Sequence, residues 1–135
     1  MVHKTKIRVR YAETDQMGIV YYANYYIWFE VGRTEYLADI GCRYTEMEEN
    51  GILLPVRTSS CTYKVSAHYD DELVIETRVT KLKGARIVFE YKVYRDDVLI
   101  TEGSTEHAFM DREGNLIKVN KHPMLRKLFS EHGLL

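Results

Sequence analysis

The chain has 135 residues, 45% of them hydrophobic and 29% charged, which suits one globular domain over residues 1–135. Its 19 basic and 20 acidic residues give a formal net charge of -1. This balance argues against nucleic-acid binding, which usually needs an excess of basic side chains. The charged N-terminal segment is unlike a signal peptide, and no apolar run approaches the roughly 20 residues of a membrane span. We therefore expect a cytoplasmic protein with no membrane span, in which Cys42 and Cys61 are reduced.

The first predicted element is a half-buried strand. Ile7, Val9 and Tyr11 alternate with basic residues, and this period of two is typical of a strand with one face on the core. A polar stretch follows at residues 13–18, where we expect a loop.

The second predicted element is a helix from Asn24 to Ile40. Asn24 suits the N-cap position, and Gly41 suits the left-handed residue that follows a helix. Apolar residues cover more than one stripe of this helix, so we expect burial on most of its sides. Gly32 costs about 1 kcal/mol of helix propensity in mid-helix, which predicts a close approach of another chain segment there.

The remaining elements are a short helix, four strands and a final short helix. We expect the short helix at 45–50 and the final helix from Pro123 to just before Gly133. The four strands are expected at 61–69, 73–79, 87–93 and 98–110, with turns at 70–71, 83–84, 96–97 and 111–115. The last strand loses its alternation near Gly103, which predicts a bulge or a bend.

This order of elements predicts an α+β fold. Consecutive strands joined by tight turns pair antiparallel. One largely apolar helix and one sheet must bury each other, and a curved antiparallel sheet wrapped around the long central helix does so. The open edges of such a sheet make a homodimer a reasonable expectation.

Chemistry is concentrated just before the long helix, where Asp15 precedes its N-terminus. Helix N-termini offer unpaired N–H groups and a positive dipole end, which can hold a developing oxyanion. Hydrolysis of a thioester needs little beyond a carboxylate and such an oxyanion site, because its thiol leaving group has a pKa near ~8.5 on the cysteine scale and leaves with little acid assistance. A carboxylate could attack the carbonyl or activate a water molecule. Taken alone, an Asp before a helix is usually a turn or capping residue, so the local pattern by itself is a weak signal for catalysis. Glu13 is the competing carboxylate, unless it is a solvated loop side chain.

The segment Thr14-Asp15-Gln16-Met17-Gly18-Ile19-Val20-Tyr21-Tyr22-Ala23-Asn24-Tyr25 closely resembles the signature of hotdog-fold thioesterases of the 4-hydroxybenzoyl-CoA thioesterase type. Residues 29–30, 33–37 and 69–73 are similar to that family as well, and the resemblance runs over residues 5–112. It implies a single hotdog thioesterase domain, which forms homodimers or homotetramers with active sites at the subunit interface.

The resemblance also implies roles for particular residues. Asp15 would be the catalytic nucleophile or base of an acyl-CoA thioesterase, and the backbone N–H of Tyr22 would polarise the thioester carbonyl. Some relatives have His where this chain has Tyr22, so any role of that imidazole is absent here. The candidate contacts to CoA are basic residues, namely Lys81, Lys83 and Arg86 near the Gly84 turn and Arg57 near the start of a strand. The candidate contacts to the acyl group are Trp28 on the helix and Ser59 on a neighbouring strand. For Trp28, simple core packing explains the residue equally well.

Other functions remain open at this point. A hotdog hydratase or dehydratase generally uses a His together with a carboxylate, but no His lies between residues 4 and 67. A non-catalytic acyl-thioester-binding dimer would not need Asp15. The five histidines have no metal-ligand spacing, and we expect neither a metal nor a cofactor, since CoA is part of the substrate. The acyl group, and the choice between CoA and carrier-protein thioesters, are not encoded in any motif.

Overall fold

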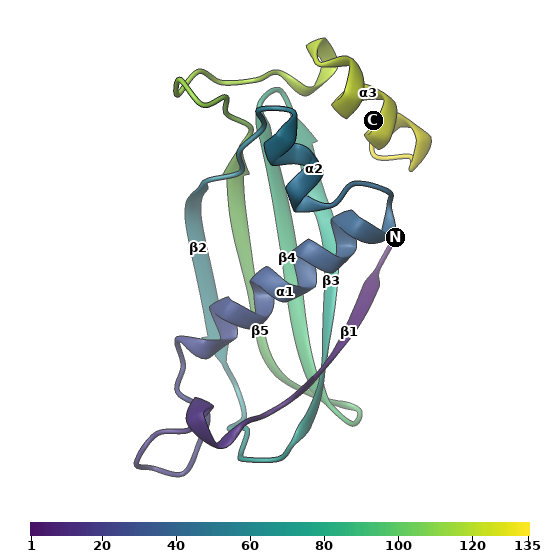
Figure 1. Cartoon of the computed structure of the whole chain (residues 1–135). Coiled ribbons are helices and arrows are strands. Elements are labelled where there is room, and N and C mark those ends of the chain that lie inside the picture. Colours follow the sequence, from purple (N-terminus) through teal and green to yellow (C-terminus); the bar gives the residue numbers. More distant parts are fainter.

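A single antiparallel sheet forms the frame of the computed structural model, which describes residues 1–135. Its five strands lie in the order β1-β3-β4-β5-β2, so that β1 and β2 are the two edges (Figure 1). The strands are β1 (His3–Arg8), β2 (Val56–Tyr63), β3 (Glu72–Lys83), β4 (Arg86–Arg95) and β5 (Val98–Ala108).

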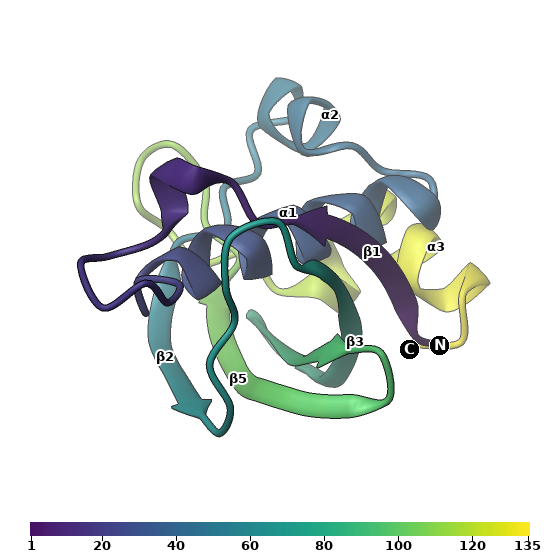
Figure 2. The same cartoon turned by 90° about the horizontal axis from the view of Figure 1, so that it is seen from below.

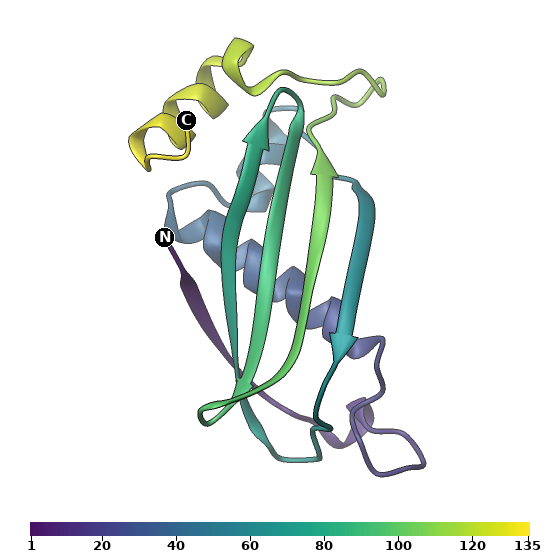
Figure 3. The same cartoon turned by 180° about the vertical axis from the view of Figure 1, so that it is seen from behind.

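The long helix α1 (Asn24–Asp39) crosses the concave face of this sheet. Seen from below, the strands curl around α1 (Figure 2), and the opposite face of the sheet carries no helix (Figure 3). Two shorter helices, α2 (Tyr44–Glu49) and α3 (Pro123–Glu131), lie toward the end of the molecule that holds the β3–β4 turn. The predicted α+β fold, with a curved sheet wrapped around a central helix, is confirmed. No helix is both long enough and apolar enough to cross a membrane.

The core lies between α1 and the middle strands. Phe29 of α1 stacks on Tyr91 of β4 with ring centroids 4.3 Å apart, and both rings are buried. Gly32 faces β3 so closely that a Cβ atom at this position would overlap the side chain of Thr77. The prediction of close packing at Gly32 is therefore confirmed, and α1 can lie directly on the sheet because this residue has no side chain.

The ends of α1 differ in part from the prediction. Asn24 is the first residue of the helix rather than its N-cap, and its side-chain amide donates a hydrogen bond to the carbonyl of Glu13 (2.8 Å). The predicted cap is wrong because this amide holds the preceding loop instead. Gly41 has φ +105° directly after the C-cap, as predicted.

Two strands also deviate from the prediction. Tyr11 is not in β1 but in a 3-10 turn (Tyr11–Glu13), where it is 77% exposed. The strand predicted at 61–69 begins earlier and ends at Tyr63, because the chain leaves the ladder of β5 after that residue although the alternation continues. Gly103 itself is regularly paired on both sides, and the irregularity of β5 lies three residues earlier, where Val93 and Tyr94 of β4 pair with Thr101 and Leu99 and leave Ile100 as the extra residue. A Cβ atom on Gly103 would come within 2.7 Å of the Phe29 ring, and this close approach explains the glycine.

Candidate active site

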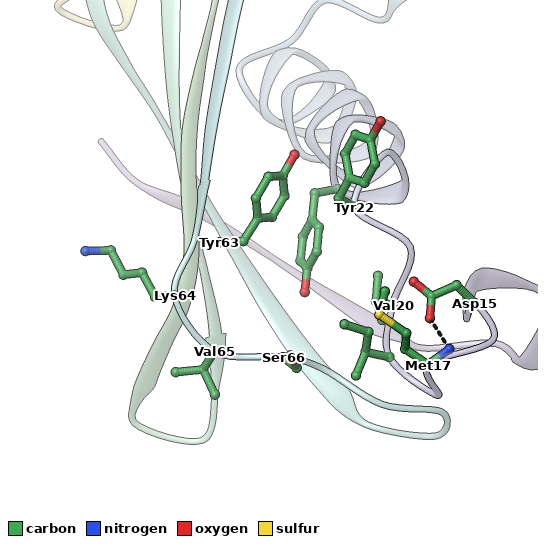
Figure 4. Close-up of a pocket in the computed structure, with 10 residues that line it drawn as sticks. Asp15, Met17, Val20, Tyr22, Tyr63, Lys64, Val65 and Ser66 are labelled. Atoms are coloured by element: carbon green, nitrogen blue, oxygen red, sulfur yellow. Dashed lines mark hydrogen bonds between the residues drawn. The ribbon is translucent and has the colours of Figure 1, made fainter.

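Asp15 lies in the short loop 14–20, which connects the 3-10 turn to α1. The first and last residues of this loop form an isolated antiparallel bridge, and the Asp15 N–H donates to the Ile19 carbonyl (2.9 Å). The Asp15 side chain accepts a hydrogen bond at Oδ1 from the backbone N–H of Met17 (2.9 Å; Figure 4). Its Oδ2 atom has no partner within the chain, so a half-buried carboxylate oxygen is held in place and is free to react.

A cavity of about 500 Å³ adjoins this carboxylate. Apolar side chains from the loop, the start of α1 and the end of β2 form most of its wall (Figure 4). The lining residues are Asp15, Met17, Ile19, Val20, Tyr22, Tyr25, Tyr63, Lys64, Val65 and Ser66. The Lys64 ammonium lies 3.4 Å from the Glu102 carboxylate, and its side chain points away from the other labelled residues. The cavity therefore offers an apolar wall next to one free carboxylate oxygen.

Tyr22 lies in the same wall, two residues before α1. Two N–H groups close to it are used, because Tyr21 donates to the Glu13 carbonyl (2.9 Å) and Asn24 donates to the Tyr21 carbonyl (2.9 Å). The Tyr22 N–H itself makes no hydrogen bond with a backbone or side-chain acceptor of the chain. This unpaired donor stands at the start of a buried helix, in a residue that lines the same cavity as Asp15, where it is available to polarise a carbonyl.

Two further tyrosines complete this wall and were not identified from the sequence. Tyr63 packs against Tyr22 and Tyr25, with ring centroids 5.9 and 5.6 Å away. Burial, followed by a hydrogen bond with Cys61, raises the pKa of Tyr63, so its hydroxyl stays protonated and neutral. The only sequence signal for Tyr63 was its place in the alternating segment, which does not distinguish a cavity wall from a sheet face.

Trp28 is not part of this cavity. Its side chain is 2% exposed, and its indole lies behind Tyr25 in an edge-to-face contact with ring centroids 5.0 Å apart. The indole N–H donates a hydrogen bond to Glu13 Oε2 (3.0 Å). Trp28 thus supports the cavity wall from the core side.

Ser59 lies in a second cavity of about 330 Å³, between α1 and β2. The other residues that line it are Tyr26, Ile27, Glu30, Arg33, Val56 and Thr105. The two cavities share no lining residue, so within one chain Ser59 is not brought to Asp15.

Glu13 is not the solvated side chain that the sequence allowed. It is 5% exposed, and its carboxylate accepts hydrogen bonds from the Arg10 backbone N–H (2.8 Å) and from Trp28. Burial alone would raise the pKa of Glu13, but the hydrogen bonds and the charge of Arg10, together with the Trp28 bond, outweigh it and lower the pKa. Glu13 is therefore ionised, and no free oxygen of its carboxylate faces the cavity.

The basic candidates lie at the far end of the sheet. Lys81, Lys83 and Arg86 are exposed around the β3–β4 turn, opposite the loop that carries Asp15 (Figure 1). Arg86 is level with Ala108 of β5, whereas Tyr63 at the cavity is level with Thr101. Seven residues of strand at about 3.3 Å each separate the two levels by about 23 Å.

Arg57 is also exposed, and it lies near the same far end, beside the first residue of β2. A single chain therefore brings together Asp15 and Tyr22 but places all four basic candidates elsewhere. No group of three or more His, Cys, Asp or Glu side chains is arranged to hold a metal ion.

The curved sheet around a central helix, with a cavity at the start of that helix, defines a hotdog-fold protein. A family model described as the thioesterase-like superfamily matches residues 9–129. A Bacillus subtilis protein, YneP, is 42% identical over 113 residues, which are 83% of this chain and 82% of that protein. An acyl-CoA thioesterase of Haemophilus influenzae is 38% identical over 106 residues, which are 78% of each chain.

A solved structure agrees with these relatives. The DHNA-CoA thioesterase from Staphylococcus aureus superposes with a TM-score of 0.91 at 34% sequence identity, covering 98% of this chain and 91% of that one. The chain belongs to the thioesterase-like superfamily, and by this homology it is a thioester hydrolase of the acyl-CoA thioesterase type.

Proposed function

We propose that the protein hydrolyses acyl-CoA thioesters to free acid and CoA, with Asp15 as the catalytic carboxylate and the Tyr22 N–H as the carbonyl polariser. The observation that carries this proposal is that Asp15, whose Oδ2 has no partner, and Tyr22, whose N–H is unpaired, line the same cavity. The acyl-CoA thioesterase of Haemophilus influenzae supports CoA as the carrier of the acyl group.

The Tyr22 N–H acts on the charge that develops during the reaction. When a nucleophile adds to the thioester carbon, the carbonyl electron pair moves to oxygen, and a fixed donor stabilises the resulting oxyanion. Collapse of the tetrahedral intermediate breaks the C–S bond and releases CoA as a thiolate. This leaving group needs little acid assistance, so no third catalytic group is required.

Asp15 can serve this reaction in two ways. As a general base it takes a proton from water while the water oxygen bonds to the carbonyl carbon, and the departing thiolate then takes that proton. As a nucleophile its free oxygen bonds to the carbonyl carbon, the C–S bond breaks, and water hydrolyses the acyl anhydride. Both routes need an ionised Asp15 whose free oxygen faces the polarised carbonyl.

The acyl group would lie against the apolar wall next to Asp15. Tyr22, Tyr25 and Tyr63 supply three aromatic surfaces there, and the cavity of about 500 Å³ is large enough for an aromatic or a medium-length aliphatic acyl group. Trp28 would contribute indirectly, by supporting Tyr25.

The distant basic residues gain a role if two copies of the chain pair through β2, which is a free edge of the sheet. Antiparallel two-fold pairing of β2 with the same strand of a second copy places the Arg57 end of one copy beside the Tyr63 end of the other. The site of each copy would then be completed by Arg57, Lys81, Lys83 and Arg86 of the second copy, which suit the phosphates of CoA.

The same pairing would bring the second cavity toward the acyl group. Ser59 lies in β2, so it would face the first cavity of the second copy. We therefore propose a homodimer of single hotdog domains as the active unit, alone or as a pair of dimers.

Release of free thiol from a panel of acyl-CoA and acyl-carrier-protein thioesters tests the proposed function. We expect turnover of CoA thioesters with apolar acyl groups. Tight binding of acyl-CoA without any thiol release would instead identify a non-catalytic binding protein, and addition of water across an acyl double bond would identify a hydratase.

A further inference from the structure

A buried, ionised carboxylate that does not line the cavity lies two residues before Asp15. Glu13 is 5% exposed, although charged side chains are almost never buried without a purpose or a partner. Its contacts reach both sides of the loop that carries Asp15 and also reach α1.

The side chain of Glu13 is fully engaged. Oε1 accepts the Arg10 backbone N–H (2.8 Å) and lies 3.3 Å from the Arg10 Nε, and Oε2 accepts the indole N–H of Trp28 (3.0 Å). Trp28 lies in the second turn of α1, so this carboxylate joins the end of the β1 segment to the helix.

The carbonyl of Glu13 is engaged as well. It accepts the backbone N–H of Tyr21 (2.9 Å) and the side-chain amide of Asn24 (2.8 Å). Tyr21 directly precedes Tyr22, and Asn24 opens α1. One residue therefore holds the chain before the catalytic loop, the chain after it and the start of the helix.

We propose that Glu13 is a positioning residue, which acts through its hydrogen bond with Trp28 to fix the Asp15 carboxylate relative to the Tyr22 N–H. Asp15 is two residues after Glu13 in the chain. Tyr22 is one residue after Tyr21, whose N–H donates to the Glu13 carbonyl. This inference rests on the proposed function, because it assigns a task to Glu13 in the reaction of Asp15.

The contact of Trp28 with Tyr25 extends the same support to the cavity. The indole meets the Tyr25 ring edge-to-face at 5.0 Å, and Tyr25 lines the cavity wall. Loss of the Glu13–Trp28 bond would therefore disturb the catalytic pair and the wall against which the acyl group lies. Small displacements of this kind are costly to catalysis, since the reacting atoms must meet within a few tenths of an ångström.

The test uses the full-length protein and the variants Glu13→Gln, Trp28→Phe and the double substitution. Glu13→Gln keeps the shape but cannot accept from both Trp28 and Arg10, because one carboxylate oxygen becomes an amide group. We expect each single substitution to lower kcat at least tenfold and to change KM less than threefold. Glu13→Gln removes the negative charge from the acceptor of the indole N–H, and Trp28→Phe removes the N–H itself, so both substitutions act on the Glu13–Trp28 bond. The kcat of the double variant should therefore be no lower than that of the worse single variant.

Tyr91→Phe is the matched control. It removes another buried hydrogen bond, the one between the Tyr91 hydroxyl and Thr105 (2.6 Å), in the middle of the sheet. We expect it to lower Tm by an amount comparable to Glu13→Gln while kcat remains within twofold of wild type. Trp28 is the only tryptophan, so its emission reports the bond directly, and it should shift in Glu13→Gln but not in Tyr91→Phe.

Four outcomes are decisive. A wild-type kcat in Glu13→Gln or Trp28→Phe would overturn the positioning role while leaving the role of Asp15 intact. The same conclusion would follow if Tyr91→Phe, at a similar loss of Tm, lowered kcat as much as Glu13→Gln does. Additive losses in the double variant would show that Glu13 does not act through Trp28. A wild-type protein that releases no thiol from any acyl thioester would overturn the proposed function, and this inference with it.

Discussion

Asp15 and Tyr63 line the same cavity, although one lies in the loop before α1 and the other at the end of the edge strand β2. This relationship joins the proposed reactive group to an aromatic wall, and it also places the cavity next to the free edge of the sheet. The proposed catalytic carboxylate, the wall for the acyl group and the proposed dimer interface therefore all lie at or next to one end of β2.

Tyr63 should determine how tightly the acyl group binds. Replacement by alanine removes aromatic contacts worth about 0.5–1.5 kcal/mol each, so we expect Tyr63→Ala to raise KM for apolar acyl-CoAs about tenfold. Tyr63→Phe keeps the ring and should leave KM within twofold of wild type. Steady-state kinetics on both variants would decide, and an unchanged KM in Tyr63→Ala would place the acyl group elsewhere.

The backbone donor at position 22 can be removed without touching Asp15. Tyr22→Pro lacks the N–H, and loss of one oxyanion donor typically costs about 10²–10³ in kcat. Tyr22→Ala keeps the N–H and should retain kcat within about fivefold. Both variants need a cooperative unfolding transition before their rates are compared. Equal losses in the two variants would indicate that the side chain, and not the backbone N–H, matters.

Gly32 should be needed for stability. A Cβ atom there meets the Thr77 side chain, and overpacking of this kind costs about 1–3 kcal/mol, which should appear in Gly32→Ala as a lower free energy of unfolding in urea. The Thr77 hydroxyl is buried and has no hydrogen-bond partner, so its removal costs little. Thr77→Ala should therefore restore part of the loss in the double variant, and a merely additive result would contradict this packing account.

The free energy of unfolding should fall as the pH falls, beginning near pH 6.5. Burial, with a smaller contribution from the charge of Arg33, lowers the pKa of His107 in the folded state. His107 thus binds a proton at higher pH in the unfolded chain than in the folded chain. The free energy of unfolding therefore decreases as the pH falls below the pKa of His107 in the unfolded chain. His107→Gln should remove this first decline.

A second decline should follow below about pH 4.5. Burial opposes ionisation of Glu13 and Asp71, but hydrogen bonds and nearby Arg charges lower the pKa of both carboxyls. Their contribution is complete above the unfolded pKa values and is lost as the pH falls through the folded ones. Urea unfolding between pH 3.5 and 7.5 measures both declines, and a constant free energy across this range would contradict them.

Much of the fold follows from local patterns, because hydrophobic periodicity and turn residues act over a few positions. The strands around Ile75 and Phe89, the turn at Gly84 and the start of α3 at Pro123 were all predictable in this way. The edge strand β2 was misplaced because most of its first residues are exposed on both faces and carry no alternation.

The candidate site was predictable only where it is local in sequence. Asp15 and Tyr22 belong to one segment, and the structure brings both to one cavity. The burial of Glu13 depends on Trp28, which belongs to another element, and the contribution of Tyr63 depends on where β2 ends. The separation of Arg86 from Asp15 depends on which end of the sheet each segment reaches, because the Asp15 loop lies near the start of β3 and Arg86 lies just after its end.

If the Asp15 carboxylate drives hydrolysis, kcat must fall when this carboxylate becomes an amide, and the kcat of Asp15→Asn measures that loss. Asp97→Asn, an exposed position in the β4–β5 turn, is the matched control. The amide is nearly isosteric and can still accept the Met17 N–H, but it can neither take a proton from water nor attack the carbonyl. We expect kcat for acyl-CoA to fall at least about 100-fold in Asp15→Asn, with acyl-CoA binding retained, and to stay at the wild-type value in Asp97→Asn. Full activity in Asp15→Asn would exclude Asp15 as the catalytic carboxylate.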